Sequence, residues 1–486
     1  MAEKMTAEDW EKYSWYRHFE KICAIPHGSG NTRGISNYLK AYASEHGWKV
    51  TQDRLGNIII RKKASEGRSR EPGVILQGHM DMVAVKQDDC PLDLKKDGLI
   101  LQNDGEFLRA KGTSLGGDDG IAIAFALAIL DDDSLSHPNL EVLFTIDEET
   151  GMDGASGLAS GALKGRYLIN VDSEWENDII AGCAGGCRLD GEKEADMFLR
   201  RGRLATLDVS GMTGGHSGVQ INLGRGNAAR VLATVLERIA EECGGQLIDL
   251  TAGTQDNVIP SSARATILLK EERIDDALAL TKQLAGKLRE NYTADPDLRI
   301  SFSPKNEPEE EYMAFTKQDT LHVCELLMNL PNDVIGMSSD MEGLVETSAN
   351  IGVVRISDHS IRISSSLRSS VESEKEKLLS RMRKMYDVYG YKTSVRGMYP
   401  GWQYDPHSLL CRKAAEVYPR IFGRKANITA IHAGLECGII MDRVGKLDCI
   451  SIGPNIYDVH SYNEKLDLYS CEREYRYLTA LLAEQF

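Results

Sequence analysis

The N-terminal part of the chain alternates short apolar segments of strand length with one long apolar helix, and this alternation restricts the fold more than any other feature. Predicted strands end near Gly78, Ile146 and Val171, and the apolar helix covers 120–131. Strands that alternate with helices form a parallel sheet covered on both faces. A similar strand, 448–452, lies near the end of the chain. The sequence therefore predicts an α/β fold with a mostly parallel sheet and helices on both faces.

The middle of the chain has a different pattern, bounded by glycine-rich breaks near 182–186 and 399–401. Amphipathic helices and strands alternate between these breaks, and each half of this stretch offers two helices and about four strands. We predict an inserted α+β lid domain over 187–402, built as an internal duplication. The main domain then consists of two segments, 1–186 and 403–486. The predicted helices of the insert are 226–242, 273–291, 316–328 and 371–388, and its strands include 204–209, 264–269 and 361–367.

Charge and targeting signals narrow the range of partners. The 486 residues carry a formal net charge of −16, which repels phosphate backbones and anionic lipid surfaces, so we expect neither nucleic acid nor membrane partners. The longest apolar run, Gly120 to Leu130, is shorter than the roughly 20 residues that span a bilayer. No apolar signal segment follows Met1–Met5, and the ten scattered cysteines are typical of reduced, mostly buried thiols. We therefore expect a cytoplasmic protein.

Four clusters of histidines and acidic residues lie just past predicted strand ends, and a fifth leads directly into the apolar helix. Each cluster alone has an ordinary explanation: a loop histidine, a helix N-cap or a solvated acidic turn. Together they occupy the edge where open α/β sheets build their sites, at the carboxyl ends of the strands. The clusters are Gly78–Asp81, Gly116–Gly120, Asp147–Gly151, Asn170–Glu174 and Asp458–Ser461.

These clusters have the composition of a metal site. Two histidines and at least three carboxylates can hold a pair of divalent ions that share one carboxylate. Mixed nitrogen and oxygen ligands fit zinc best, and cobalt or manganese would also be compatible. Ions about 3.5–4 Å apart can activate a water molecule between them. Because residues two apart on a strand share a face, Asp81 can orient His79.

The order of the motifs resembles the M20 metallopeptidases, and within them the bacterial aminoacyl-histidine dipeptidases. The resemblance rests on His79-x-Asp81, on Gly-Gly-Asp-Asp-Gly at 116–120, on Asp-Glu-Glu-Thr-Gly at 147–151, on Asp172-Ser-Glu and on the late His460. It covers essentially the whole chain, the insert included. It implies a two-metal enzyme that hydrolyses small dipeptides, with a preference for Xaa-His substrates including β-alanyl-histidine.

The resemblance also implies a ligand set. His79, Asp118 and Asp172 would hold one ion, and Asp118, Glu149 and His460 would hold the other. Asp118 is placed as the bridge because the family's bridge is the first acid of its pair. The peptide bond after Asp118 is expected to be cis.

Adjacent Glu148 and Glu149 need different roles. A metal-bound carboxylate is a poor base because its lone pairs are engaged, so its neighbour must stay free near the reacting water. The resemblance, not the physical chemistry, makes Glu148 the general base. It also makes Asp81 the residue that orients His79.

The remaining candidates lie mostly in the insert. Gly214–Gly218 could be a phosphate-binding loop or a flexible turn, but the resemblance implies that its His216 stabilises an oxyanion. Asn257 and Arg368 would bind the substrate carboxylate, although an arginine at a strand end can equally be a surface charge. Glu436 would receive the substrate's free amino group.

Several alternatives remain open from the sequence. Another M20 amidohydrolase, such as an N-acyl amino-acid deacylase or a tripeptidase, would carry similar motifs, and so would a metal-binding scaffold that has lost catalysis. A phosphate site at 214–218 is disfavoured because no P-loop lysine follows it. We interpret His432 as structural. A homodimer through the lid domain is typical of the family, but a duplicated lid could supply the same residues within one chain. Lid closure predicts hinges near Gly185-Gly186 and Pro400-Gly401.

Overall fold

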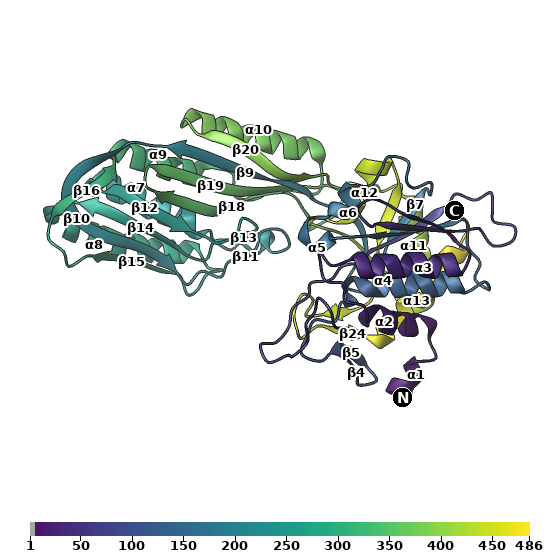
Figure 1. Cartoon of the computed structure of the whole chain (residues 1–486). Helices are drawn as coiled ribbons and strands as arrows, with labels where there is room; N and C mark the ends of the chain where they lie inside the picture. Colours follow the sequence, from purple (N-terminus) through teal and green to yellow (C-terminus); the bar gives the residue numbers. More distant parts are fainter. Residues whose placement is uncertain (1–4) are drawn as a thin grey trace. The chain divides into compact units, whose positions relative to one another are not determined.

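The computed structural model describes residues 5–486, which divide into two compact units (Figure 1). Unit 1 contains the chain up to Gly182 together with Tyr404–Ala430 and Leu435–Phe486, and unit 2 contains Cys183–Gln403 and Ile431–Gly434. Residues 1–4 lie outside the described residues. They belong to the N-terminal segment in which we predict no secretory signal. Within the described chain, no helix combines the length and the apolar character needed to cross a membrane.

Unit 1 is built on an eight-stranded sheet of order β1-β2-β6-β3-β7-β22-β8-β21. Its four central strands, β6, β3, β7 and β22, are parallel, whereas β1, β2 and β8 join as antiparallel strands. Every residue of β3, β6 and β7 is buried, so both faces of the sheet centre are covered. The predicted α/β fold is confirmed, with a mixed sheet whose parallel part is central. The bounds are β1 Lys49–Gln52, β2 Ile58–Lys62, β3 Val74–His79, β6 Leu140–Thr145, β7 Tyr167–Asn170, β8 Asp178–Cys183, β21 Asn427–Ile431 and β22 Asp448–Ser451.

Helix α4, Gly117–Asp131, lies at the centre of the unit 1 core. Its residues from Ile121 to Leu130 are all buried, because the helix is apolar on every side. It packs on β3 and on α2, Ser14–Cys23, and shares one apolar core with them. The other helices are α1 Ala7–Trp10, α3 Arg33–Glu45, α5 Glu148–Gly151, α6 Asp153–Ser156, α11 Leu409–Phe422, α12 Glu436–Val444 and α13 Leu468–Ala483.

A small four-stranded sheet of order β23-β24-β5-β4 completes unit 1. Its strands are β4 Leu101–Asn103, β5 Phe107–Ala110, β23 Ile456–Tyr457 and β24 Lys465–Asp467. The antiparallel pair β23 and β24 brackets the loop 458–464. This sheet therefore places a late segment of the chain beside strands that come more than 300 residues earlier.

Unit 2 is an antiparallel ten-stranded sheet with four helices and its own apolar core. The predicted helices are confirmed; α7, for example, begins after Asn227, whose side chain accepts the Ala229 N–H, and ends at Gly244 in the left-handed region. The internal duplication stays a prediction. The helices are α7 Ala228–Cys243, α8 Ile274–Asn291, α9 Lys317–Asn329 and α10 Glu372–Val388. The strands are β9 Gly185–Glu194, β10 Met197–Ser210, β12 Gln246–Ala252, β14 Ala263–Leu269, β15 Arg299–Pro304, β16 Glu310–Phe315, β17 Asp333–Met337, β18 Val345–Ser357, β19 Ser360–Ser369 and β20 Lys392–Tyr399, with the short pair β11 Gly215–His216 and β13 Val258–Ile259.

The glycines at the two predicted hinges have a packing reason in unit 2. Cys183 and Trp402 exchange two backbone hydrogen bonds of 2.8 and 2.9 Å. A side chain at Gly185 would place its Cβ 2.3 Å from the backbone nitrogen of Gly401, so the two strands can only pass each other at glycine. Hinge motion stays a prediction.

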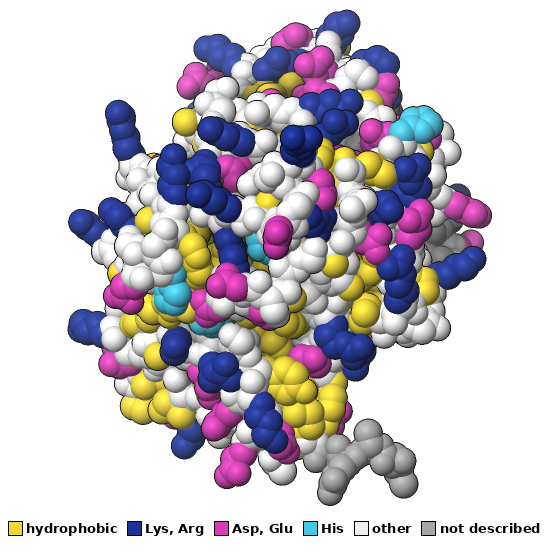
Figure 2. Space-filling model, turned by 90° about the vertical axis from the view of Figure 1, so that its right-hand side faces the viewer, with side chains coloured by type: hydrophobic (Ala, Val, Ile, Leu, Met, Phe, Trp, Pro, Cys, Tyr) yellow, Lys and Arg dark blue, Asp and Glu magenta, His cyan; other side chains and the backbone are white. Residues whose placement is uncertain are grey.

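The net charge of −16 is not a uniformly acidic surface. Figure 2 shows lysine and arginine side chains interspersed with acidic ones on the face that it presents. Part of the negative charge is buried instead, at Asp81, Asp119, Glu436 and Glu464. Buried carboxylates require compensation by hydrogen bonds, protons or cations, and these four lie in unit 1.

Candidate metal centre

His79 is the last residue of β3 and is fixed by the backbone just beyond it. Its Nδ1 lies 2.9 Å from the backbone oxygen of Asp81 and 3.5 Å from the Asp81 carboxylate. A carbonyl oxygen can only accept, so Nδ1–H donates and Nε2 is left to face the acidic cluster. Nε2 lies 2.9 Å from an Asp118 oxygen and 3.6 Å from an Asp172 oxygen. The ring is therefore oriented as a metal-ligating histidine requires.

The two aspartates at the start of α4 have their carboxylates in different surroundings. Asp118 and Asp119 have non-helical backbone angles, and the peptide bond between them is cis, as the resemblance implies. Asp119 is buried beneath β3, where its Oδ2 accepts the His79 N–H at 3.0 Å. Asp118 keeps both oxygens directed at histidines instead. This geometry gives a physical reason for choosing Asp118 over Asp119 as the shared ligand.

We predict that Gly78→Ala destabilises unit 1 by about 1–3 kcal/mol, the usual range for overpacking. A Cβ at this position would lie 2.4 Å from both the Ala122 Cβ and an Asp119 oxygen. The measurement is the free energy of unfolding in urea. Gly286→Ala in α8 is the control, because its Cβ would meet nothing within 4 Å; equal stability of the two variants would contradict the prediction.

The five predicted ligands come together in unit 1. The ligand atoms of His79, Asp118 and Asp172 all lie within 4.8 Å of one another, and so do those of Asp118, Glu149 and His460. Asp118 alone belongs to both of these groups. A third group joins His79 and Glu149 to Glu148. These are the two sets and the shared carboxylate that the resemblance implies, while ligation itself stays a proposal.

Asp81 has a second task that the sequence does not suggest. Its carboxylate accepts the backbone N–H of Glu148 at 2.9 Å and that of Glu149 at 3.3 Å. It also accepts the Ser29 hydroxyl at 2.8 Å. Asp81 therefore holds the turn at the start of α5 in place, and so positions both glutamates as well as His79.

The carboxylates of this cluster stabilise positive charge on the groups beside them. Hydrogen bonds to Asp118 and Glu149 raise the pKa of His460 to about 11. Burial and the neighbouring carboxylates raise the pKa of Asp172 to about 6. Although burial opposes it, hydrogen bonds from His460 and His79 lower the pKa of Asp118. A site that binds protons this strongly is suited to bind divalent cations through the same atoms. The Glu149 Oε1 lies 2.8 Å from the His460 Nε2, so this oxygen and this ring nitrogen face each other as two ligands of one cation would.

Two further glutamates near the cluster have raised pKa values. Burial, followed by repulsion from Asp172 and other acids, raises the pKa of Glu148 well above its ordinary value. Burial also raises the pKa of Glu436 to about 7. Glu436 is wholly buried, and its Oε2 accepts hydrogen bonds of 2.6 Å from Gln77 and Thr145. Its Oε1 has no partner, so one oxygen remains available for a further donor.

His216 in unit 2 is held as a hydrogen-bond donor. Its Nδ1 accepts the backbone N–H groups of Gly218 and Val219 at 3.2 and 3.3 Å. The ring proton therefore sits on Nε2. Burial, reinforced by Arg368 and Arg188, lowers the pKa of His216, which keeps the ring neutral.

The two predicted carboxylate-binding residues are also in unit 2. Arg368 is buried rather than a surface charge, and it donates to the Tyr399 hydroxyl at 2.9 Å while its Nε has no partner. Asn257 adjoins β13, and its backbone oxygen accepts the Ser217 N–H at 2.9 Å. A buried guanidinium with a free N–H is available for a planar anion.

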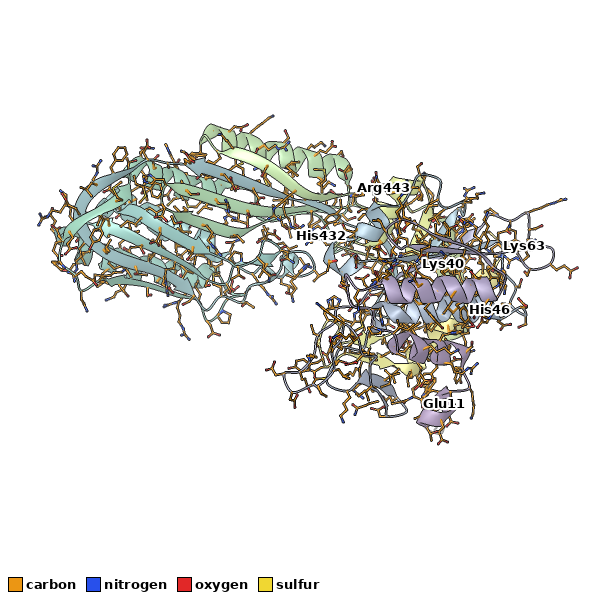
Figure 3. All side chains as sticks on the ribbon, viewed as in Figure 1. Glu11, Lys40, His46, Lys63, His432 and Arg443 are labelled. Carbon is orange, nitrogen blue, oxygen red and sulfur yellow. The ribbon has the colours of Figure 1, made fainter. Side chains whose placement is uncertain are left out.

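His432, labelled in Figure 3, is buried against β18, where its Nε2 lies 2.7 Å from the Ser348 hydroxyl. Burial and the nearby Arg368 lower its pKa from 6.5 to about 4. In the unfolded chain this ring gains a proton near pH 6.5, while in the folded chain it stays neutral down to about pH 4. Protons therefore bind the unfolded state preferentially in this window, and its contribution to stability is lost as the pH falls through it.

We therefore predict that wild type loses more stability than His432→Gln between pH 6.5 and pH 4. Urea unfolding at the two ends of this window measures the difference. The exposed His407 provides the control variant, His407→Gln, which should lose as much stability as wild type. An identical loss in all three proteins would contradict the assignment.

A cavity of about 750 Å³ in unit 1 lies away from this centre, beside the amino ends of β3 and β6. Its lining is basic, and none of the predicted site residues contributes to it. We therefore locate the metal centre by the chemistry of its side chains and not by the size of a cavity. The lining includes Trp48, Lys49, Arg61, Lys62, Lys63, Glu141 and Lys164; Lys63 is labelled in Figure 3.

Sequence reasoning missed three residues that support the centre. Ser29 and Thr145 hold Asp81 and Glu436, and Glu464 binds the backbone before Asp118. Ser29 lies in a loop and Thr145 inside an apolar strand, so neither carries a local signal. Of these three residues, Glu464 alone carries a local sequence signal, because it lies four residues after His460.

A protein with this mixed sheet, inserted antiparallel unit and paired ligand groups has the architecture of a metal-dependent hydrolase. The model of peptidase family M20/M25/M40 matches residues 75–484, and the chain belongs to this family. The predicted family is thus confirmed.

Two relatives are similar over nearly the whole chain. Cytosol non-specific dipeptidase from Escherichia coli (strain K12) is 39% identical over 469 residues, which cover 96% of each protein. The crystal structure of aminoacylhistidine dipeptidase from Vibrio alginolyticus has a TM-score of 0.90 at 34% identity, again over 96% of each chain. Aminopeptidase PepT from Bacillus cereus, with a TM-score of 0.56 at 14% identity over 97% of each chain, shares the fold.

Proposed function

We propose that this chain is a two-metal dipeptidase that hydrolyses dipeptides, including Xaa-His dipeptides such as β-alanyl-histidine. The observation that carries the proposal is the pair of ligand groups that share Asp118, with Glu148 beside them. The names of the two similar proteins, a non-specific dipeptidase and an aminoacylhistidine dipeptidase, support the substrate class.

The residues present fit two divalent ions. One set would be His79, Asp118 and Asp172, and the other Asp118, Glu149 and His460. This mixture of imidazole and carboxylate suits zinc, and cobalt or manganese is also compatible. When bound, the ions would polarise the scissile carbonyl and make water a stronger nucleophile at neutral pH.

Glu148 is the proposed general base. It takes a proton from the attacking water and then delivers that proton to the leaving amine. Its raised pKa favours the first transfer, because the carboxylate is then a stronger base and holds the proton until the leaving amine takes it. Asp81 keeps the carboxylate in place through the Glu148 N–H.

We assign the candidate residues of unit 2 to contacts with the substrate. His216 would donate from Nε2 to the carbonyl oxygen as negative charge develops there; such donors contribute about 3–4 kcal/mol to catalysis. Asn257 and Arg368 would bind the dipeptide's carboxylate. Glu436, in unit 1, would accept the free amino group through its unpartnered oxygen.

A substrate panel tests the proposal. Steady-state rates are measured with zinc, cobalt or manganese loading on β-alanyl-histidine, other dipeptides, a tripeptide and an acetylated amino acid. We expect the highest kcat/KM on dipeptides. Faster hydrolysis of the acetylated amino acid or the tripeptide would instead identify another M20 amidohydrolase, and two bound metals without hydrolysis would identify a scaffold.

We propose a cytoplasmic location, supported by the name of the Escherichia coli relative. The homodimer through the lid domain, 187–402, also stays a prediction. Sedimentation of the purified protein tests it, and a monomer at micromolar concentration would contradict it.

A further inference from the structure

A buried carboxylate outside the predicted site binds the loop that leads into it. Glu464 is 3% exposed, and its side chain accepts three backbone N–H groups. Oε2 accepts those of Leu115 at 2.7 Å and Gly116 at 3.0 Å, and Oε1 accepts that of Gly117 at 2.8 Å. One side chain therefore fixes three consecutive peptide groups.

Those peptide groups directly precede Asp118. Gly116 is in the left-handed region, with φ 69°, and Leu115 is fully buried. N–H groups before a helix have no partner within the helix, and burial makes them costly to leave unpaired. The position of the Asp118 carboxylate follows from where this turn is held.

Glu464 also closes the loop that carries His460. The loop 458–464 joins β23 to β24, and Asp458 and His460 both have positive φ, 54° and 60°. Within the loop, the Ser461 hydroxyl donates to the backbone oxygen of Asp458 at 2.7 Å, and the Glu464 N–H donates to the backbone oxygen of Ser461 at 3.2 Å. Glu464 is thus the last residue of the loop, immediately before β24.

We propose that Glu464 is a positioning residue of the metal centre, because it ties the turn that carries Asp118 to the loop that carries His460. The His460 Nε2 lies 3.2 Å from an Asp118 oxygen, and these two groups come from segments 342 residues apart. Their separation depends on the relative placement of the two loops, and the Glu464 carboxylate joins those loops directly. This inference rests on the proposed two-metal function.

The chemistry requires a carboxylate at this position. All three partners are donors, so the side chain must accept at both oxygens. Glutamine would keep one acceptor and place its NH₂ group against a backbone N–H, which displaces the turn. Aspartate keeps both acceptors but is one methylene shorter.

The experiment compares Glu464→Gln and Glu464→Asp with a matched control, Glu141→Gln. Glu141 is also a buried carboxylate of unit 1 that accepts backbone N–H groups, from Lys164 at 2.6 Å and Gly165 at 2.7 Å. It lies at the amino end of β6, whereas the metal centre lies at the carboxyl ends. Apo protein is titrated with cobalt(II), and the readouts are stoichiometry, affinity, the visible cobalt spectrum and the melting temperature.

We expect Glu464→Gln to weaken cobalt binding by about 10–100-fold, the usual effect of losing a group that orients ligands, and to change the cobalt spectrum. Glu464→Asp should fall between wild type and Glu464→Gln. Glu141→Gln should lower the melting temperature and leave the cobalt affinity and spectrum unchanged. Wild-type affinity and spectrum in Glu464→Gln would overturn the proposal.

If Glu464→Gln does not fold, Glu464→Asp is judged by the same criteria. Failure of both variants to fold while Glu141→Gln folds would assign Glu464 to the fold alone and overturn the proposal. Failure of the proposed function is separable, because it shows in the wild type as fewer than two bound cobalt ions or no dipeptide hydrolysis. Too few bound ions in the wild type would remove this inference as well.

Discussion

Replacing Glu148 with alanine is expected to lower kcat for dipeptide hydrolysis by about 10²–10⁴-fold, the usual contribution of general acid–base catalysis. The side chain belongs to neither of the two proposed ligand sets that share Asp118, although it lies within reach of His79 and Glu149. Its loss removes the group that accepts the proton of the attacking water and leaves both ligand sets complete. Two metal ions per chain should therefore remain bound.

The decisive measurement is kcat together with metal content on the same preparation. Asp153→Ala, at an exposed acid five residues further along the chain, is the control and should keep both activity and metal. Retained turnover in Glu148→Ala would remove Glu148 as the base. Loss of one metal ion would show instead that Glu148 is a ligand and that Glu149 needs another role.

Asp118→Ala is expected to remove both metal ions and all measurable dipeptidase activity. Asp118 is the only residue shared by the two ligand groups, so its loss leaves each ion with two of its three predicted protein ligands. It also leaves His79 and His460 without their hydrogen bonds of 2.9 and 3.2 Å. Low affinity at both positions should appear as less than one ion per chain by elemental analysis.

Asp172→Ala provides the graded comparison for this prediction. Asp172 belongs to only one of the two groups that contain Asp118, so its loss should reduce occupancy of one ion and leave the other near one per chain. Asp458→Ala, at an exposed acid in the His460 loop, should keep both ions. Two ions in Asp118→Ala would show that the sites do not share this carboxylate.

The regular elements of the fold followed closely from local sequence patterns. The apolar segments at 74–76 and 140–146 are strands β3 and β6, and the predicted helix at 371–388 is α10, Glu372–Val388. Both patterns arise from burial: a strand buried on both faces is apolar throughout, and a half-buried helix repeats every 3.6 residues. The outer strand β1 was not predicted, because it has four residues and none of them is buried.

The candidate ligands could be predicted for a similar reason. Each cluster alone has an ordinary explanation, but several histidines and carboxylates at the carboxyl ends of neighbouring strands indicate a site, and His79 and Asp172 stand out by this position. Asp118 stands out because two acids follow two glycines at the start of the apolar helix. The choice between Asp118 and Asp119 needed the resemblance, and the structure supplies its physical cause in the burial of Asp119 under β3. The supporting contacts from Ser29 and Glu464 could not be predicted, since they join distant segments.

The sequence by itself determined the elements, the chemical identity of the candidate ligands and their order along the chain, because these depend on local periodicity and on residue type. Only the tertiary structure decided which atoms meet. His460 and Asp118 come from 342 residues apart, and Glu464 and Leu115 from 349. No local pattern encodes such distances, because they arise when the sheet, α4 and the small β23–β24 hairpin pack into one core.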